Sequence, residues 1–167
     1  MPALRWITVA LFIVLPGLAL AQGSNVALGG LAFDNSAPIE VSADELSVDP
    51  NDGAAVFEGN VVVAQGDLRL AAGFIRVEYA TDENGNQTPS IGRVSASGGV
   101  TFVNGSDAAE AKEAVYAVED GSLVLSGDVL LTQGGNAVAG DQLFVDLNSG
   151  TGRMEGRVRT VFQTGAE

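Results

Sequence analysis

The chain has 167 residues, with no Cys, no His and a net charge of −13 from 8 Lys and Arg against 21 Asp and Glu. The missing Cys and His exclude disulfides, Cys/His metal sites, haem ligation and every His-based catalytic triad. A binder of nucleic acid carries a basic surface, so this acidic balance argues against that class.

The N-terminus has the pattern of an export signal. Arg5 precedes an uncharged stretch, residues 7–21, which ends in the small-x-small sequence Ala19-Leu20-Ala21. Such a pattern predicts a cleaved signal peptide over residues 1–21, and hence an exported protein, which without Cys fits a bacterial envelope protein. The alternative is that the segment is retained as a membrane anchor. Cleavage leaves residues 22–167 with a net charge of −14, because Arg5 is removed.

The next segment, residues 22–38, is rich in Gly and weakly patterned, and we interpret it as a flexible leader. From Ile39 onward apolar and other residues alternate with a period of two, which predicts β-strands. The segment 108–118 also has helix-friendly spacing, but its neighbours favour a strand. The sequence therefore predicts one all-β domain over residues 39–163, followed by a tail at 164–167.

A repeated glycine marks the internal organisation of this domain. Gly59, Gly98, Gly127 and Gly156 each stand in an apolar-x-Gly-x-Val pattern, at intervals of 39, 29 and 29 residues. The long first interval contains the polar segment 81–90, which we interpret as a turn insertion. A glycine inside a strand marks a bend or bulge, so these four predict a crease running across stacked strand layers. The alternative is that all four are ordinary turn glycines.

The ordered motifs resemble those of the LptA/OstA-like family. They are Ala-Asp-Glu-Leu-Ser-Val at 43–48, Phe-Glu-Gly-Asn-Val at 57–61, Gly-Asp-Leu-Arg-Leu-Ala at 66–71 and Val-Glu-Tyr at 77–79. The resemblance implies an open, twisted β-jellyroll built of repeated antiparallel strand layers. It also implies a periplasmic carrier that holds the lipid A acyl chains of lipopolysaccharide in an apolar groove.

The same resemblance implies the partners and the chemistry. It implies a bridge from inner to outer membrane, made by head-to-tail self-association through edge strands. An LptC-like inner-membrane protein and an LptD-like outer-membrane translocon would stand at its two ends. It implies no catalytic residue, no cofactor and no metal. Two alternatives stay open: a structural β-solenoid scaffold of the envelope, and an LptC-like partner anchored by residues 1–21.

The repeat register assigns one apolar side of each strand to the interior. We expect Leu46, Val48, Phe57, Val94 and Tyr116 to point inward, while Arg157 and Arg159 point outward on the last strand. The residues expected to line an acyl-chain groove are Val61, Val63, Leu68, Leu70, Ile75, Val77, Val100, Phe102, Leu125, Val129, Leu131, Leu143, Val145, Met154 and Val158. The alternative is that these side chains fill a closed hydrophobic core.

Overall fold

The alternating residues form long β-strands joined by tight turns. The structure is a computed structural model that describes residues 24–27, 38–49 and 53–163. The strands are β1 (Ser24–Ala27), β2 (Glu40–Ser42), β3 (Glu45–Asp49), β4 (Ala54–Gln65), β5 (Leu68–Thr81), β6 (Gln87–Asn104), β7 (Asp107–Ala117), β8 (Ser122–Gln133), β9 (Asn136–Asp146), β10 (Thr151–Glu155) and β11 (Arg159–Val161). The helix-friendly segment 108–118 lies mostly within strand β7.

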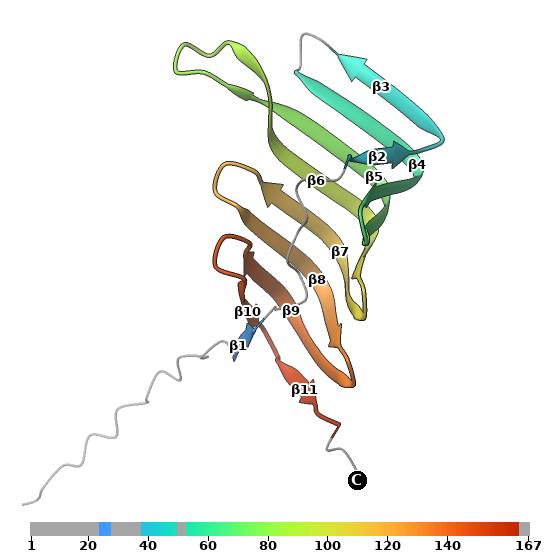
Figure 1. Cartoon of the computed structure of the whole chain (residues 1–167), viewed down its shortest axis with the longest axis vertical. Helices are drawn as coiled ribbons and strands as arrows, with labels where there is room; N and C mark the ends of the chain where they lie inside the picture. The colour runs from blue at the N-terminus through green and yellow to red at the C-terminus, as the bar shows by residue number, and fades with distance from the viewer. Residues whose placement is uncertain (1–23, 28–37, 50–52, 164–167) are drawn as a thin grey trace, which may run out of the picture.

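All eleven strands belong to one antiparallel sheet. From β3 to β10 each strand pairs with the next along the chain, so the order in space follows the sequence (Figure 1). At the N-terminal end β2 and β3 both pair with β4, and at the C-terminal end β11 pairs with β9 and β1 pairs with β10. The two ends do not pair with each other within the described residues. The predicted all-β, open antiparallel fold is therefore confirmed.

The repeated glycines bend every second strand at mid-length. Gly59, Gly98 and Gly127 lie inside strands, and Gly156 lies between β10 and β11; all four have positive φ, from 74° to 83°. The pairing register shifts at each of the first three, as in a β-bulge. The four bends lie in one row across the sheet, which confirms the predicted crease.

The crease lets one sheet bury its own apolar face. A single flat sheet leaves both faces in water, yet Val61, Leu143 and Met154 have no exposed surface. Residues from both sides of the crease, such as Ile75 and Leu131, belong to one hydrophobic cluster. Since the described residues contain no second sheet and no helix, the two halves must cover each other.

The structure corrects two sequence-based assignments. Residues 24–27, placed in a flexible leader, form β1 on the sheet; four residues are too few to show a period, and their partner strand lies near the other end of the chain. The insertion at 81–90 is only partly a turn. Asp82 accepts hydrogen bonds from the backbone N–H groups of Asn84 and Asn86, and Gln87 already begins β6.

The export signal and the tail lie outside the described residues, as does most of the leader. Within the ranges that the structure does describe, no helix is long and apolar enough to cross a membrane.

Candidate functional site

The inner face of the folded sheet gathers the apolar side chains expected there. Ten of the fifteen expected groove residues are buried, and five are partly buried against them: Val63, Leu68, Leu70, Val77 and Val158. All fifteen thus belong to the same cluster. Phe57, Val94 and Tyr116 also pack against it.

Rows of paired residues show how the register produces this face. One row crosses the whole sheet on one side of the crease and consists of Leu46, Phe57, Ile75, Ala96, Ala114, Leu125, Leu143 and Met154. A second row lies on the other side and consists of Val41, Val63, Leu70, Phe102, Ala109, Leu131, Val138 and Thr160. The first row is apolar throughout, and the second is apolar from Val41 to Val138 and ends in the hydroxyl side chain of Thr160 on β11.

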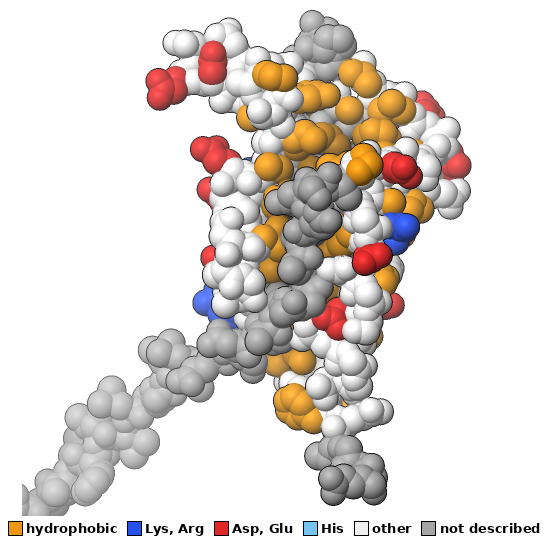
Figure 2. All heavy atoms as spheres, viewed as in Figure 1, with side chains coloured by type: hydrophobic (Ala, Val, Ile, Leu, Met, Phe, Trp, Pro, Cys, Tyr) orange, Lys and Arg blue, Asp and Glu red, His pale blue; other side chains and the backbone are white. Residues whose placement is uncertain are grey.

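Burial differs between the two ends of the rows. At the C-terminal end Leu131, Leu143 and Met154 are fully buried. At the N-terminal end Leu46 and Val48 are 55% and 60% exposed, because β3 is an edge strand without an outer neighbour. Figure 2 shows hydrophobic side chains gathered in the upper part of the view, over the region of β3 to β6. The interior is packed at one end and partly open at the other.

Small side chains occupy the middle of the inner face. The alanines there are Ala72, Ala96, Ala109, Ala111 and Ala114. Sequence reasoning missed all of them, because it selected bulky residues. The signal was present: each alanine lies two or four residues along its strand from another inward position, on the same side of the pleat.

A methionine closes the crease at the C-terminal end. Met154 lies beside Gly140 on β9, where an added Cβ would stand 2.6 Å from Met154 Cγ and 2.7 Å from its Sδ. Gly140 therefore makes room for this side chain, and the close contact explains why Met154 has no exposed surface.

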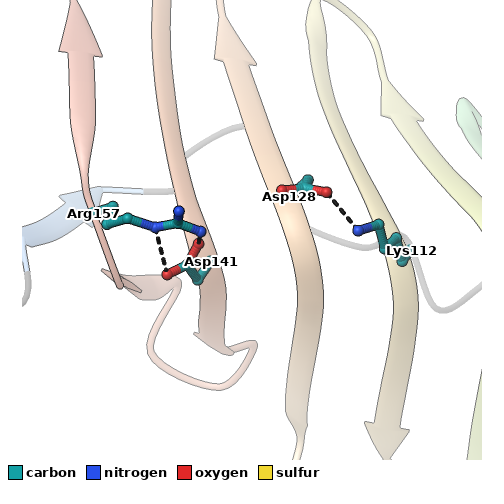
Figure 3. Close-up of polar contacts among 4 residues, drawn as sticks. All are labelled: Lys112, Asp128, Asp141 and Arg157. Atoms are coloured by element: carbon teal, nitrogen blue, oxygen red, sulfur yellow. Dashed lines mark hydrogen bonds and ion pairs between the residues drawn. The ribbon is translucent and has the colours of Figure 1, made fainter.

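The outer side of the crease carries polar pairs that recur from layer to layer. Asp44 accepts a hydrogen bond of 2.8 Å from the Asn60 side chain. Lys112 on β7 lies 2.5 Å from Asp128 on β8, and Arg157 donates to both carboxylate oxygens of Asp141 on β9 (Figure 3).

Each of these three pairs joins a residue in the left-handed region to the residue sixteen positions earlier. The left-handed member is Asn60, Asp128 or Arg157, whose φ lies between 43° and 50°. The charged pairs are exposed, so they contribute little to stability individually. They hold neighbouring strands in register at the bends.

These contacts shift the ionisation of the exposed carboxyls. The hydrogen bond from Lys112 lowers the pKa of Asp128 below its ordinary value of 3.8, and that from Arg157 does the same to the pKa of Asp141. Both carboxyls stay charged at neutral pH. They serve as partners for cations on the outer face, away from the apolar interior.

Groups suited to chemistry are sparse within the part of the chain that the structure describes. Asp107 is the one buried charged side chain there, and it accepts hydrogen bonds from Ser106 and Gln133 at the β6–β7 turn. No cluster of acidic side chains in the described ranges has a geometry that could hold a metal ion. The arrangement suits an apolar ligand held by shape.

Comparisons with known proteins agree with this interior. The family model described as "LptA/(LptD N-terminal domain) LPS transport protein" matches residues 40–151. The chain belongs to this family. Family members are lipopolysaccharide transport proteins and not enzymes, so the family confirms both the resemblance and the expected lack of an enzymatic role.

Two curated relatives extend the family match. An uncharacterized protein of Rhizobium meliloti (strain 1021) is 32% identical over 148 residues, which cover 84% of this chain and 79% of the relative. The lipopolysaccharide export system protein LptH of Pseudomonas aeruginosa is 40% identical over 70 residues, covering 42% of this chain and 38% of that protein.

A solved structure shares the fold. The crystal structure of LptH from Pseudomonas aeruginosa, described as the LptA-homologous periplasmic component of a lipopolysaccharide transport device, superposes with a TM-score of 0.64 at 24% identity. The match covers 78% of this chain and 98% of that one. At this identity the match supports the fold alone.

Proposed function

We propose that this LptA-family protein carries lipopolysaccharide through the periplasm by holding its acyl chains against the inner face of the sheet. The observation that carries the proposal is the apolar inner face that stays partly open from β3 to β6. A closed core of the same composition would bury Phe57, Val63 and Leu70 fully, yet each is only partly buried.

The physical basis is the hydrophobic effect. Each acyl methylene removed from water contributes about 0.8 kcal/mol, so a few chains are held without any polar contact. From β2 and β3 to β9 the inner rows consist of Val, Leu, Ile, Ala and Phe, which present no hydrogen-bonding group to fix one position of the ligand. Such a surface lets chains slide along the groove, as a conduit requires.

The two edges of the sheet are suited to joining copies head to tail. Continuing the antiparallel register past β10 places Met154 opposite Leu46 of a second copy and Arg157 beside its Asp44. The row that ends in Met154 then continues into Leu46 of the next copy, while Thr160 stands between Val138 and the next Val41 in the second row. An edge strand adds a neighbour in this way through backbone hydrogen bonds, and β10 can do so once β1 no longer occupies its outer edge.

Charge supports the same arrangement. The C-terminal edge carries Arg153 and Arg159, both exposed, in addition to Arg157. The N-terminal edge carries exposed acidic residues, among them Glu40, and the segment 38–68 contains no Lys or Arg. In the continued register Arg157 comes beside Asp44 and Arg159 lies diagonal to Glu40, whereas Glu155 comes opposite Glu45, so the joint gains two opposite-charge contacts and one like-charge contact. In the bridge the outermost edges would instead meet the LptC-like and LptD-like partners.

The periplasmic location rests on the predicted signal peptide at residues 1–21. N-terminal sequencing of protein recovered from the envelope tests it: a chain that begins at Gln22 supports the carrier, whereas a retained Met1 supports the anchored, LptC-like alternative.

Photo-crosslinking from a matched pair of neighbouring residues tests the groove. Val63 points to the inner face and is half-buried, while Val62, next to it on β4, is 38% exposed on the outer face. We expect a photoreactive residue at Val63 to crosslink lipopolysaccharide and the same residue at Val62 not to do so. Equal crosslinking at both positions would contradict the groove, and crosslinking at neither would favour a scaffold with a filled core.

A further inference from the structure

The N-terminal strand β1 occupies the outer edge of β10. It pairs antiparallel with β10, with Ser24 opposite Met154 and Ala27 opposite Thr151. In this position it continues the sheet by one strand beyond its C-terminal hairpin (Figure 1). The edge that β10 would otherwise expose is thereby covered by a segment of the same chain.

This edge is the one that a second copy needs for the head-to-tail joint. In the continued register Met154 faces Leu46 of the partner, but in the monomer it faces Ser24. One strand edge has room for one neighbour. Pairing with β1 and pairing with β3 of a second copy therefore exclude each other. The inference that follows rests on the proposed function, because it concerns the control of that joint.

We propose that β1 is a displaceable cover that keeps the C-terminal edge closed until the N-terminal edge of a second copy replaces it. β1 offers four residues to β10 and none to β11, whereas the incoming edge offers the five residues of β3 to β10 and the three of β2 to β11. A longer pairing makes more backbone hydrogen bonds and replaces the shorter one.

Charge makes the replacement selective. Residues 22–27 contain no charged side chain, so β1 adds no ionic partner to those that Arg153 and Arg157 already have in Glu155 and Asp141. The incoming edge brings Asp44 beside Arg157 and Glu40 within diagonal reach of Arg159, which together outweigh the one like-charge pair of Glu45 and Glu155. An acidic edge therefore displaces β1 better than a neutral strand does. The cover lets the monomer cross the periplasm without pairing its edge with unrelated strands.

A reversible lock on β1 tests this proposal. The chain has no Cys, so the double substitution Ala27→Cys/Thr151→Cys creates one disulfide between directly opposed residues and leaves the arginines in place. We expect the oxidised protein to remain monomeric in sedimentation velocity at concentrations where the reduced protein assembles. The disulfide pair Val103→Cys/Ala108→Cys, within the β6–β7 hairpin, is the matched control and should leave assembly unchanged in both redox states.

A variant that releases β1 from β10 should have the opposite effect on self-association. Asn25→Pro/Val26→Pro removes two successive N–H groups, of which one points at β10 in an antiparallel pair. If β1 covers the edge nine-tenths of the time, its release strengthens apparent self-association about tenfold. Equal assembly of the oxidised lock, the reduced lock and the releasing variant would overturn the proposal.

A measurement of lipid binding distinguishes failure of the β1 proposal from failure of the proposed carrier function. Crosslinking of lipopolysaccharide from Val63 is measured on the same samples, and the lock should not change it. If lipid binds and none of the variants assembles, the joint and its cover are both wrong while the groove stands. If the lock instead blocks only an outer-membrane partner, the second copy is the wrong occupant.

Discussion

Substitution of the glycines at one bend measures what the crease contributes to the fold. Gly98 and Gly99 both have positive φ, at 80° and 84°. A Cβ at Gly99 would meet no atom within 4 Å, whereas a Cβ at Gly98 would stand 3.2 Å from the Cα of Gly73 and 3.4 Å from its N. The two glycines therefore separate the cost of the backbone angle from the cost of the close approach between β5 and β6.

The expected loss of stability in each variant follows from these two costs, that of the backbone angle and that of the close approach. An L-residue in the left-handed region costs about 1–2 kcal/mol, which is the whole expected effect of Gly99→Ala. In Gly98→Ala the backbone of Gly73 must also move, which adds about 1–3 kcal/mol of overpacking. Gly98→Ala should thus lower the melting temperature by roughly 4–20 °C, at about 2–4 °C per kcal/mol for a domain of this size.

The assay is thermal and urea unfolding of the two variants beside Gly99→Asn. The position equivalent to Gly99 in the first bend holds Asn60 at a φ of 47°, so asparagine should be tolerated there better than alanine. Equal destabilisation by Gly98→Ala and Gly99→Ala would refute the close approach of β5 and β6 as the reason for the glycine. An unstable Gly99→Asn would refute the equivalence of the bends.

Three further predictions concern the outer face, the closed end and the joint. Asp141→Asn should lower stability at pH 7, and the loss should shrink as the pH falls below 3.8, because the lowered pKa of Asp141 gives a contribution that is fully present above the ordinary value of 3.8 and is lost as the pH falls through the lowered pKa; thermal unfolding against pH checks this. Gly140→Ala should cost about 1–3 kcal/mol in urea unfolding, and Met154→Val in the same chain should recover part of it, whereas additive losses would exclude their contact. Arg159→Glu should weaken self-association in sedimentation, and adding Glu40→Arg should restore it; a double variant weaker than the single one would rule out their pairing.

Much of this fold follows from the local periodicity of the sequence. Alternation placed the strands, and the spacing of Gly59, Gly98 and Gly127 predicted the row of bends, because a two-residue left-handed bulge has few alternatives to glycine at its first position. The resemblance and the register together predicted which apolar side chains share the cluster. These features depend on residues close in the sequence or repeated at a fixed interval.

Features that depend on distant pairing escaped prediction. The strand at 24–27 forms only because the edge of β10 lies beside it, and no local signal reports an edge at the other end of the chain. The exposure of Leu46 and Val48 is equally non-local, since a neighbour strand would bury both. The inner alanines escaped because alanine is common on either face of a strand. The sequence thus predicts the repeated strand layers better than it predicts the strands at the two edges of the sheet.

The strong negative net charge affects how two copies of the protein can approach each other. On the outer face the acidic residues Glu110 and Glu113 are exposed, and removal of the predicted signal makes the net charge more negative, −14 instead of −13. Two copies approaching side by side therefore repel each other within the roughly 8 Å over which charges act at physiological salt. An approach that brings the arginines of the C-terminal edge to the acidic N-terminal edge turns this repulsion into attraction. The charge pattern thus opposes lateral contact more than it opposes the proposed end-to-end joint, which is the geometry that continues the row from Met154 to Leu46 of the next copy.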